Sequence, residues 1–279
     1  ESNGNYRLSG FVQVDGEKKV WIKAVDNADN ETVFSHEVKV VPAAVIEWTL
    51  ELENNSPSGT VKYNAGTWYA KGQFKVKIGG TLDSAPPGGS PMNVKIEQGS
   101  TTKALTDFFD SWTDPKILPS SSPNTYTVKS GQTEGEYTIK IDDAQGQAKL
   151  LTFTIDGTAP TITLDPSVPA DNTWVNTKAL SVSGMAADVT SGIEKIEAIV
   201  NSGTPKLLGT ESPWSGYLTL NEGNNTVQFK VTDKAGNTAS TPTPPRTIKV
   251  DTGRPTITLT APANGQALVN RTSTSYQVT

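Results

Sequence analysis

Apolar and polar residues alternate over many short stretches of this chain. In residues 226–231 the apolar positions are Val227, Phe229 and Val231, with a polar residue between each pair. The same alternation occurs in TVFSHEVKV at 32–40 and GEYTIKI at 135–141. Because a period of two places alternate side chains on one face of a strand, each stretch is predicted to be a half-buried β-strand. The many Gly, Pro, Ser and Thr residues fit short strands joined by turns, so the predicted fold class is all-β.

Two kinds of segment recur along the chain, and together they define a repeat. One kind has a turn, an apolar pair and a strand, as in AGTWYAKGQFKVKI at 65–78, DNTWVNTKALSVSG at 171–184 and NGQALVNRTSTSYQVT at 264–279. The other is a predicted hairpin that closes each unit, with matching aspartates at Asp26, Asp143 and Asp233. Those aspartates are 117 and 90 residues apart, which is the size of an immunoglobulin-like sandwich.

The order of these segments predicts the domain organisation. Residues 1–43 are predicted to be the C-terminal part of one Ig-like domain, 44–157 a whole domain with longer loops, 158–252 a whole domain, and 253–279 the N-terminal part of another. Neither partial domain has enough strands to close a core alone. Two explanations stay open: the chain continues beyond this window, or a neighbouring copy completes the sandwich by strand addition.

Three stretches carry a family resemblance. IDGTAPTITLD at 155–165, VDTGRPTITLT at 250–260 and GYLTLNEGNNTVQFKVTDKAGNTAS at 216–240 resemble the bacterial Ig-like (Big-type) repeats of large secreted adhesins, surface-layer proteins and multi-modular cell-surface proteins. The segment VPAAVIEWTLEL at 41–52 departs from the pattern, because it lacks the aspartate and the T-A-P turn. The resemblance implies an extracellular protein of a bacterial cell surface, with calcium held by aspartates at module junctions.

Composition removes several classes of function. The net charge is −5 with both signs interspersed, which argues against a nucleic-acid partner. No run of apolar residues is long enough for a membrane span. The absence of cysteine excludes thiolate chemistry, and the single histidine, His36, lies in a predicted strand and is expected to face solvent. Carboxylates alone remain for catalysis, and nothing places one opposite another across a cleft, so we predict that the chain is not an enzyme.

Aspartates at the ends of the modules are the candidate calcium ligands. Asp156 and Asp251 each follow the last strand of a module, Asp233 lies at a hairpin tip, and Asp165 lies near a junction, as does Asp188. Calcium takes roughly six to eight oxygen ligands, and several carboxylates converging at a junction would supply them. The alternative is that the aspartate of D-x-x-G-N only hydrogen-bonds its own turn. No protein cofactor is required in either case.

Aromatic residues suggest a second type of site. The loops within 81–124 contain Phe108, Phe109 and Trp112 among Asp107, Asp110 and Asp114. These rings would form a ligand surface for glycan, or would lie in a short helical turn and cover the open end of the sandwich. Trp68 and Trp174, at matching repeat positions, are expected to pack into the cores rather than bind sugar.

The sequence therefore favours non-catalytic spacer modules, serving as a stalk, layer or filament unit of a bacterial surface protein. The alternative is an adhesive or carbohydrate-binding module that uses the 81–124 loops; a weaker one is an accessory part of a surface enzyme. Expected partners are other copies or further domains of the same protein, and a glycan or cell-surface ligand.

Overall fold

The computed structural model describes residues 16–25, 31–40, 45–83, 85–86, 88–119 and 123–258, and for strands β1 and β2 chiefly the backbone. The N-terminal strands β1 (Gly16–Val25) and β2 (Glu31–Val40) form an antiparallel hairpin. His36 lies in β2 as predicted, but its side chain and most of the two predicted partial domains lie outside the described residues.

The first complete sandwich has two sheets and one short helix. One sheet has the order β11-β6-β10-β7, with β3 also paired to β6, and the other has the order β4-β5-β13-β12-β8-β9. The elements are β3 (Glu47–Glu53), β4 (Gly59–Asn64), β5 (Thr67–Gly72), β6 (Lys75–Thr81), β7 (Ser90–Pro91), β8 (Asn93–Gln98), β9 (Thr101–Lys103), α1 (Leu105–Phe108), β10 (Lys116–Leu118), β11 (Asn124–Thr127), β12 (Gly135–Asp142) and β13 (Ala148–Ile155).

The second sandwich also has two sheets, with orders β14-β16-β19 and β15-β21-β20-β17-β18. Its strands are β14 (Thr161–Leu164), β15 (Thr173–Val175), β16 (Ala179–Ala187), β17 (Ile193–Val200), β18 (Lys206–Gly209), β19 (Trp214–Thr219), β20 (Gly223–Asp233) and β21 (Thr238–Val250). The all-β prediction is confirmed: the chain is a tandem of Ig-like β-sandwiches.

Strand alternation builds a separate core in each sandwich. Phe74, Val76 and Ile78 are fully buried in the first, in a cluster drawn from residues 46–155. Val227, Phe229 and Val231 are each at most 2% exposed in the second, whose cluster is drawn from residues 168–250. The predicted inward face of residues 226–231 is thus correct. Because the cores do not share residues, each sandwich is stabilised by its own burial of apolar area.

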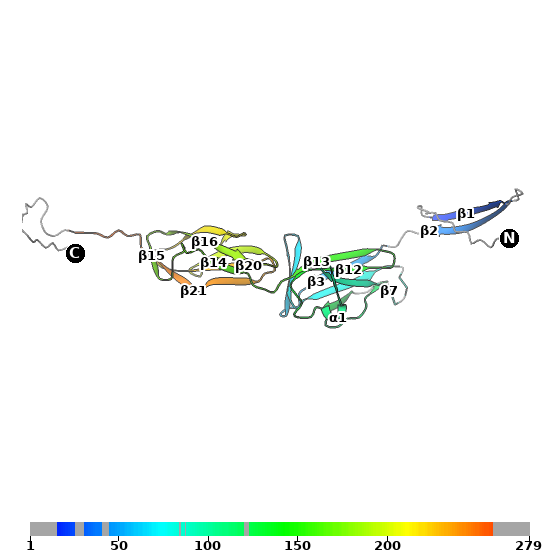
Figure 1. The fold of residues 1–279 in the computed structure, drawn as a ribbon, viewed down its shortest axis with the longest axis horizontal. Helices are drawn as coiled ribbons and strands as arrows, with labels where there is room; N and C mark the ends of the chain where they lie inside the picture. The colour runs from blue at the N-terminus through cyan, green and yellow to red at the C-terminus, as the bar shows by residue number, and fades with distance from the viewer. Residues whose placement is uncertain are drawn as a thin grey trace, which may run out of the picture.

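The two sandwiches lie end to end, joined by a short linker (Figure 1). Asp156 and Gly157 follow β13, and β14 begins at Thr161, so only a few residues separate the last strand of one from the first of the next. The φ of Gly157 is not in the left-handed region. A Cβ added at Gly157 would lie 3.7 Å from Glu134 Oε1, an ordinary van der Waals distance. The domain boundaries themselves remain a prediction.

The two repeat-related tryptophans differ in environment. Trp68 is half-buried on β5, packs against the first core and is paired with Tyr63 of β4, with ring centroids 4.9 Å apart. Trp174 is 62% exposed, so its predicted role as a packing anchor is wrong. The reason is that β4 covers the outer edge of β5, whereas in the described residues β15 pairs only with β21.

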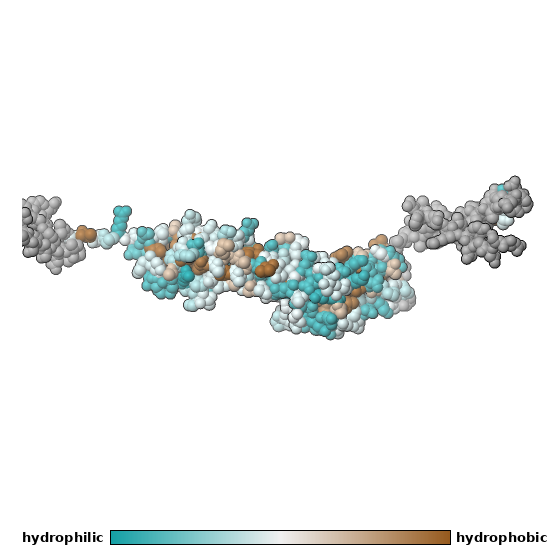
Figure 2. Space-filling model, in the orientation of Figure 1, coloured by the Kyte–Doolittle hydropathy of each residue, from teal (hydrophilic) through white to brown (hydrophobic). Residues whose placement is uncertain are grey.

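The surface of the two sandwiches shows small apolar groups among hydrophilic residues on the face drawn in Figure 2. Within the described part of the chain, no helix has the length and apolar character required to cross a membrane.

Candidate functional site

Three aspartates from distant parts of the chain meet where the sandwiches join. Asp156 follows β13, Asp188 follows β16, and Asp233 is the last residue of β20. One carboxylate oxygen from each lies within 4.8 Å of the other two. Asp156 and Asp233 are fully buried and Asp188 is half-buried. Two of the predicted calcium ligands, Asp156 and Asp233, are thus brought together with Asp188.

The Asp233 carboxylate is held by its own hairpin. Its Oδ1 accepts the Asn237 backbone N–H at 2.8 Å, and its Oδ2 accepts the Asn237 side-chain amide at 2.9 Å. Asp143 of the first sandwich accepts the Gln147 backbone N–H in the same way, at 2.7 Å. The predicted turn chemistry is therefore present in both hairpins. It does not exhaust the lone pairs of Asp233, since each oxygen has two.

The other two aspartates keep acceptor capacity. Asp188 Oδ1 accepts the N–H groups of Ser191 and Gly192, at 2.8 and 2.7 Å. Asp156 Oδ1 accepts the N–H of Thr158 at 3.1 Å, but its buried Oδ2 has no hydrogen-bond partner. An unpaired buried carboxylate oxygen is costly, which makes Asp156 Oδ2 the atom most in need of a ligand.

Electrostatics at this cluster favour a cation. Burial raises the pKa of Asp156, and repulsion from Asp188 and Asp233 raises it further. The nearby Ser191 hydroxyl and the Thr158 N–H oppose this by stabilising the charged form, although Ser191 makes no well-aligned bond to Oδ2. Three carboxylates in a buried site repel one another unless a proton or a cation neutralises them. Hard oxygen donors of this kind suit Ca²⁺ or Mg²⁺.

The other two predicted metal ligands lie elsewhere. Asp165 is exposed at the far end of β14, where Ser167 lowers its pKa by hydrogen bonding. Asp251 is exposed after β21, at the position that corresponds to Asp156, and its Oδ1 accepts the Gly253 N–H at 2.8 Å. The chain that would complete a junction around Asp251 lies outside the described residues.

A glutamate that we did not predict secures the linker. Glu134 Oε1 accepts the Gly157 N–H and the Thr158 hydroxyl, at 2.9 and 2.7 Å, and Oε2 accepts the Thr190 hydroxyl at 3.2 Å. In the second sandwich Glu222 accepts both the N–H and the hydroxyl of Thr252. Each glutamate precedes a glycine with positive φ, so the repeated Glu-Gly before a strand was the available sequence signal.

The β4–β5 hairpin also reaches across the junction. Lys62 Nζ forms an ion pair with Glu194 Oε2 at 2.6 Å, and the Asn64 amide donates to Glu194 Oε1 at 3.1 Å. Lys71 Nζ donates to the Gly236 carbonyl oxygen at 2.9 Å. These three contacts, which we call the hairpin clamp, join the first sandwich to the start of β17 and to the hairpin that follows Asp233.

The aromatic cluster is mostly core. Phe108 and Phe109 are 0% and 1% exposed, so the predicted ligand-binding role of these two rings is wrong. They lie at the end of α1, where Phe108 packs on Tyr137 and Phe109 on Tyr126. This burial agrees with the alternative prediction of a short helical turn that packs on the sandwich. Trp112 is half-buried, and it remains available for contact with a ligand.

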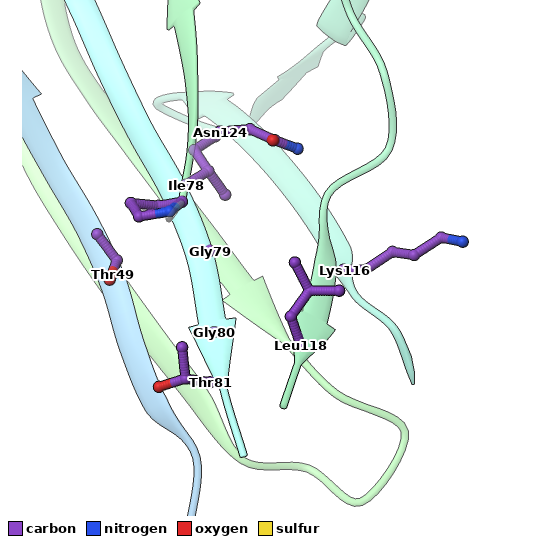
Figure 3. Close-up of a pocket in the computed structure, with 9 residues that line it drawn as sticks. Thr49, Ile78, Gly79, Gly80, Thr81, Lys116, Leu118 and Asn124 are labelled. Carbon is purple, nitrogen blue, oxygen red and sulfur yellow. The ribbon is translucent and has the colours of Figure 1, made fainter. Parts of the chain in front are cut away.

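Among the surface hollows, the one drawn in Figure 3 is too small for a ligand. It lies on β6 at Gly79 and Gly80, between Thr49 and Leu118, and has a volume of about 10 Å³. A volume of this size holds at most one water molecule. The Lys116 side chain extends away from it.

No family model and no curated protein matches the sequence. Several solved structures are similar to this chain at low sequence identity. The fibronectin(III)-like modules of Clostridium thermocellum CbhA are 16% identical, with a TM-score of 0.34, covering 72% of this chain and 93% of that chain. Three N-terminal domains of the bacteriophage RB49 Hoc protein are 10% identical, with a TM-score of 0.34, covering 88% and 92%. The titin tandem A164–A165 is 12% identical, with a TM-score of 0.26, covering 75% and 97%.

The two sandwiches and the short linker between them define a class: tandem Ig-like β-sandwich modules.

Proposed function

We propose that the chain is a non-catalytic spacer of a bacterial extracellular surface protein, of the Big-type repeat class, whose module junction is stiffened by calcium. The observation that carries the proposal is the buried, unpartnered Oδ2 of Asp156, which lies among the carboxylates of Asp188 and Asp233. Other copies or further domains of the same surface protein are the proposed partners.

The position of the cluster explains why a cation would stiffen the rod. Asp156 belongs to the linker, whereas Asp188 and Asp233 belong to the second sandwich. An ion bound to all three would tie the linker to the loops of the next module, and the three carboxylates would contribute three to six oxygens. Backbone carbonyls or water would supply the remaining ligands. Calcium suits such a site better than magnesium because it accepts irregular geometry.

The hairpin clamp and Glu134 also support a stiffened junction, through contacts that need no metal ion. They make polar contacts across the junction at Glu194, Gly236 and Thr190. We therefore expect the metal-free junction to be partly ordered and calcium to narrow its range of angles.

Calcium titration of the full chain, followed by hydrogen exchange, tests the site. We expect a dissociation constant in the range of roughly 10⁻⁷ to 10⁻³ M, as for sensor and extracellular sites. Calcium should slow exchange in peptides that contain residues 156–158, 188–192 and 233–237. Asp156→Asn and Asp188→Asn should abolish this protection, and the exposed Asp165→Asn is the matched control that should retain it.

The spacer role needs a second measurement. Small-angle scattering with calcium and with excess chelator should give the same end-to-end arrangement but a narrower distribution of maximum dimension with calcium. If calcium does not protect these peptides from hydrogen exchange, the proposed metal site would be refuted. If calcium binds but the distribution of maximum dimension stays the same, the metal site would be confirmed and the stiffening role refuted.

A further inference from the structure

We infer that the first sandwich carries a binding groove for a neutral carbohydrate chain, formed between β8 and the segment that holds Trp112. This site is separate from the junction and goes beyond the spacer function. The groove has a volume of about 700 Å³. That volume lies within the roughly 300–1,000 Å³ range of small-molecule sites. Its apolar lining residues include Met92, Val94, Leu105 and Trp112.

Among the described residues, the aromatic neighbours of Trp112 are Phe109 and Tyr126. Its centroid lies 5.2 Å from that of Phe109 and 4.6 Å from that of Tyr126. The Phe109 and Tyr126 centroids are only 5.3 Å apart, so these rings cannot sandwich the indole between them. Phe109 and Tyr126 therefore support the indole from the core side, and Trp112 itself lines the groove. An indole that aromatic rings support on its core side and that also lines a groove can act as a stacking platform for an apolar sugar face.

The rim supplies hydrogen-bonding groups without net charge. Asp114, Asp142, Lys95 and Lys116 line the groove, two of each sign. Asp114 Oδ1 accepts the Trp112 indole N–H at 2.9 Å, which fixes the ring, and Asp142 Oδ1 accepts the Asn93 amide at 3.0 Å. Carboxylates and ammonium groups of this kind can accept and donate to hydroxyls. A balanced rim fits a neutral, polyhydroxylated ligand better than a charged polymer.

Strand addition by a peptide is disfavoured at the same place. β8 is paired with β12 along Asn93–Gln98, and on its other side with β9 from Ile96 to Gln98. The open edge therefore spans only residues 93–95, which is shorter than the strands that usually add to a sheet. Recognition at the groove must depend on side chains, as sugar binding does.

Titration of the 15N-labelled full chain with neutral oligosaccharides tests the inference. The probes are soluble hexamers of glucose, mannose, galactose and xylose, with polylysine and polyglutamate as charged comparisons. We expect at least one neutral hexamer to give saturable shift changes at residues 91–95 and 112–116, including the Trp112 indole N–H. Trp112→Phe, which keeps the packing on Phe109, should weaken this binding at least fivefold. Asp114→Asn should weaken it too.

The exposed Trp174 provides the matched control. Trp174→Phe should leave the affinity unchanged, because that ring is 62% exposed in the second sandwich and lies outside the groove. The inference is overturned by no saturable change with any neutral hexamer, by changes that map to Trp174, or by binding of only a charged polymer. Unchanged affinity in both Trp112→Phe and Asp114→Asn would also overturn it, whether or not calcium binds at the junction.

Discussion

The side-chain amide of Asn237 donates to the main-chain carbonyl oxygen of Asp156 at 3.1 Å, so a hairpin tip of the second sandwich is bonded to the end of the first. The same amide donates to Asp233 Oδ2 at 2.9 Å. Gln147 occupies the matching hairpin position in the first sandwich, where its Oε1 accepts the Ile46 N–H at 3.3 Å. In both modules, therefore, the residue four positions after the hairpin aspartate bonds the incoming chain.

Asn237→Ala should weaken the junction. The substitution leaves the buried Asp156 carbonyl oxygen and Asp233 Oδ2 without this donor, which should cost about 1–3 kcal/mol of local stability. Hydrogen exchange of the peptide that contains residues 233–237 measures this loss as faster exchange. The exposed Asn93→Ala, which removes an amide bonded to Asp142, is the control and should leave that peptide unchanged. Equal exchange in both variants would contradict the role assigned to Asn237.

The hairpin clamp should show coupling between modules. Lys62 and Glu194 are 35% and 28% exposed, so their pair is partly screened and should contribute about 0.2–1 kcal/mol. A double-mutant cycle of Lys62→Met and Glu194→Gln, read from hydrogen exchange at the junction, measures the coupling. Excess chelator should increase the effect of each substitution on the angle distribution, because the clamp then acts without the cation. Strictly additive effects would show that the pair does not join the modules.

Phe109→Ala should destabilise the first sandwich alone. Phe109 is 1% exposed, and truncation of a buried phenylalanine costs about 3–5 kcal/mol. Hydrogen exchange should accelerate throughout residues 46–155 and stay slow in 168–250, because the cores share no residues. Val189→Ala, at a fully exposed position, is the control for a neutral truncation. A stable Phe109→Ala variant would restore this ring as a candidate for ligand contact.

The sequence predicted strands and turns well because these depend on neighbouring residues. Alternation placed Val227, Phe229 and Val231 in the core, and turn chemistry placed the Asp233 carboxylate on its own hairpin. The sequence was less able to predict which aspartates lie close together in space. Asp165 lies only nine residues after Asp156, yet β14 carries it away from the junction at about 3.3 Å per residue.

The clamp could not be predicted for a different reason. Lys62 and Glu194 are 132 residues apart, and their pairing depends on the relative orientation of two sandwiches. Alternation of polar residues on an edge strand carries no information on that orientation. The exposure of Trp174 was also inaccessible, because it follows from the lack of a strand equivalent to β4 beside β15 in the described residues.

Stability should depend on pH through Asp142. Hydrogen bonds from Lys140 and then Asn93 lower the pKa of this carboxyl below its ordinary value. The charged form therefore stabilises the folded chain fully above the unfolded pKa of about 3.9, and the contribution is lost as pH falls through the lower folded pKa. Asp142→Asn should lower Tm by about 1–3 °C at pH 6, and the difference should vanish near pH 2. In a Lys140→Met background, the Tm difference that Asp142→Asn causes at pH 6 should be smaller. A Tm gap that is independent of pH would contradict this account.

Gly184→Ala should be among the most damaging single-methyl additions in the second sandwich. Gly184 lies on β16, paired with Leu164 of β14 and Trp214 of β19. An added Cβ would overlap the Thr163 carbonyl oxygen and lie 2.6 Å from Trp214 Cζ2, so either β14 or the indole must move. Because Trp214 is 3% exposed and packs against Phe229 with the two rings tilted, the shift should cost about 1–3 kcal/mol and alter Trp214 fluorescence. Gly209→Ala is the matched control, since its Cβ would approach the same tryptophan at an ordinary 3.8 Å. Thermal unfolding should separate the two variants by several degrees, and equal Tm values would show that β14 and β16 can separate at little cost.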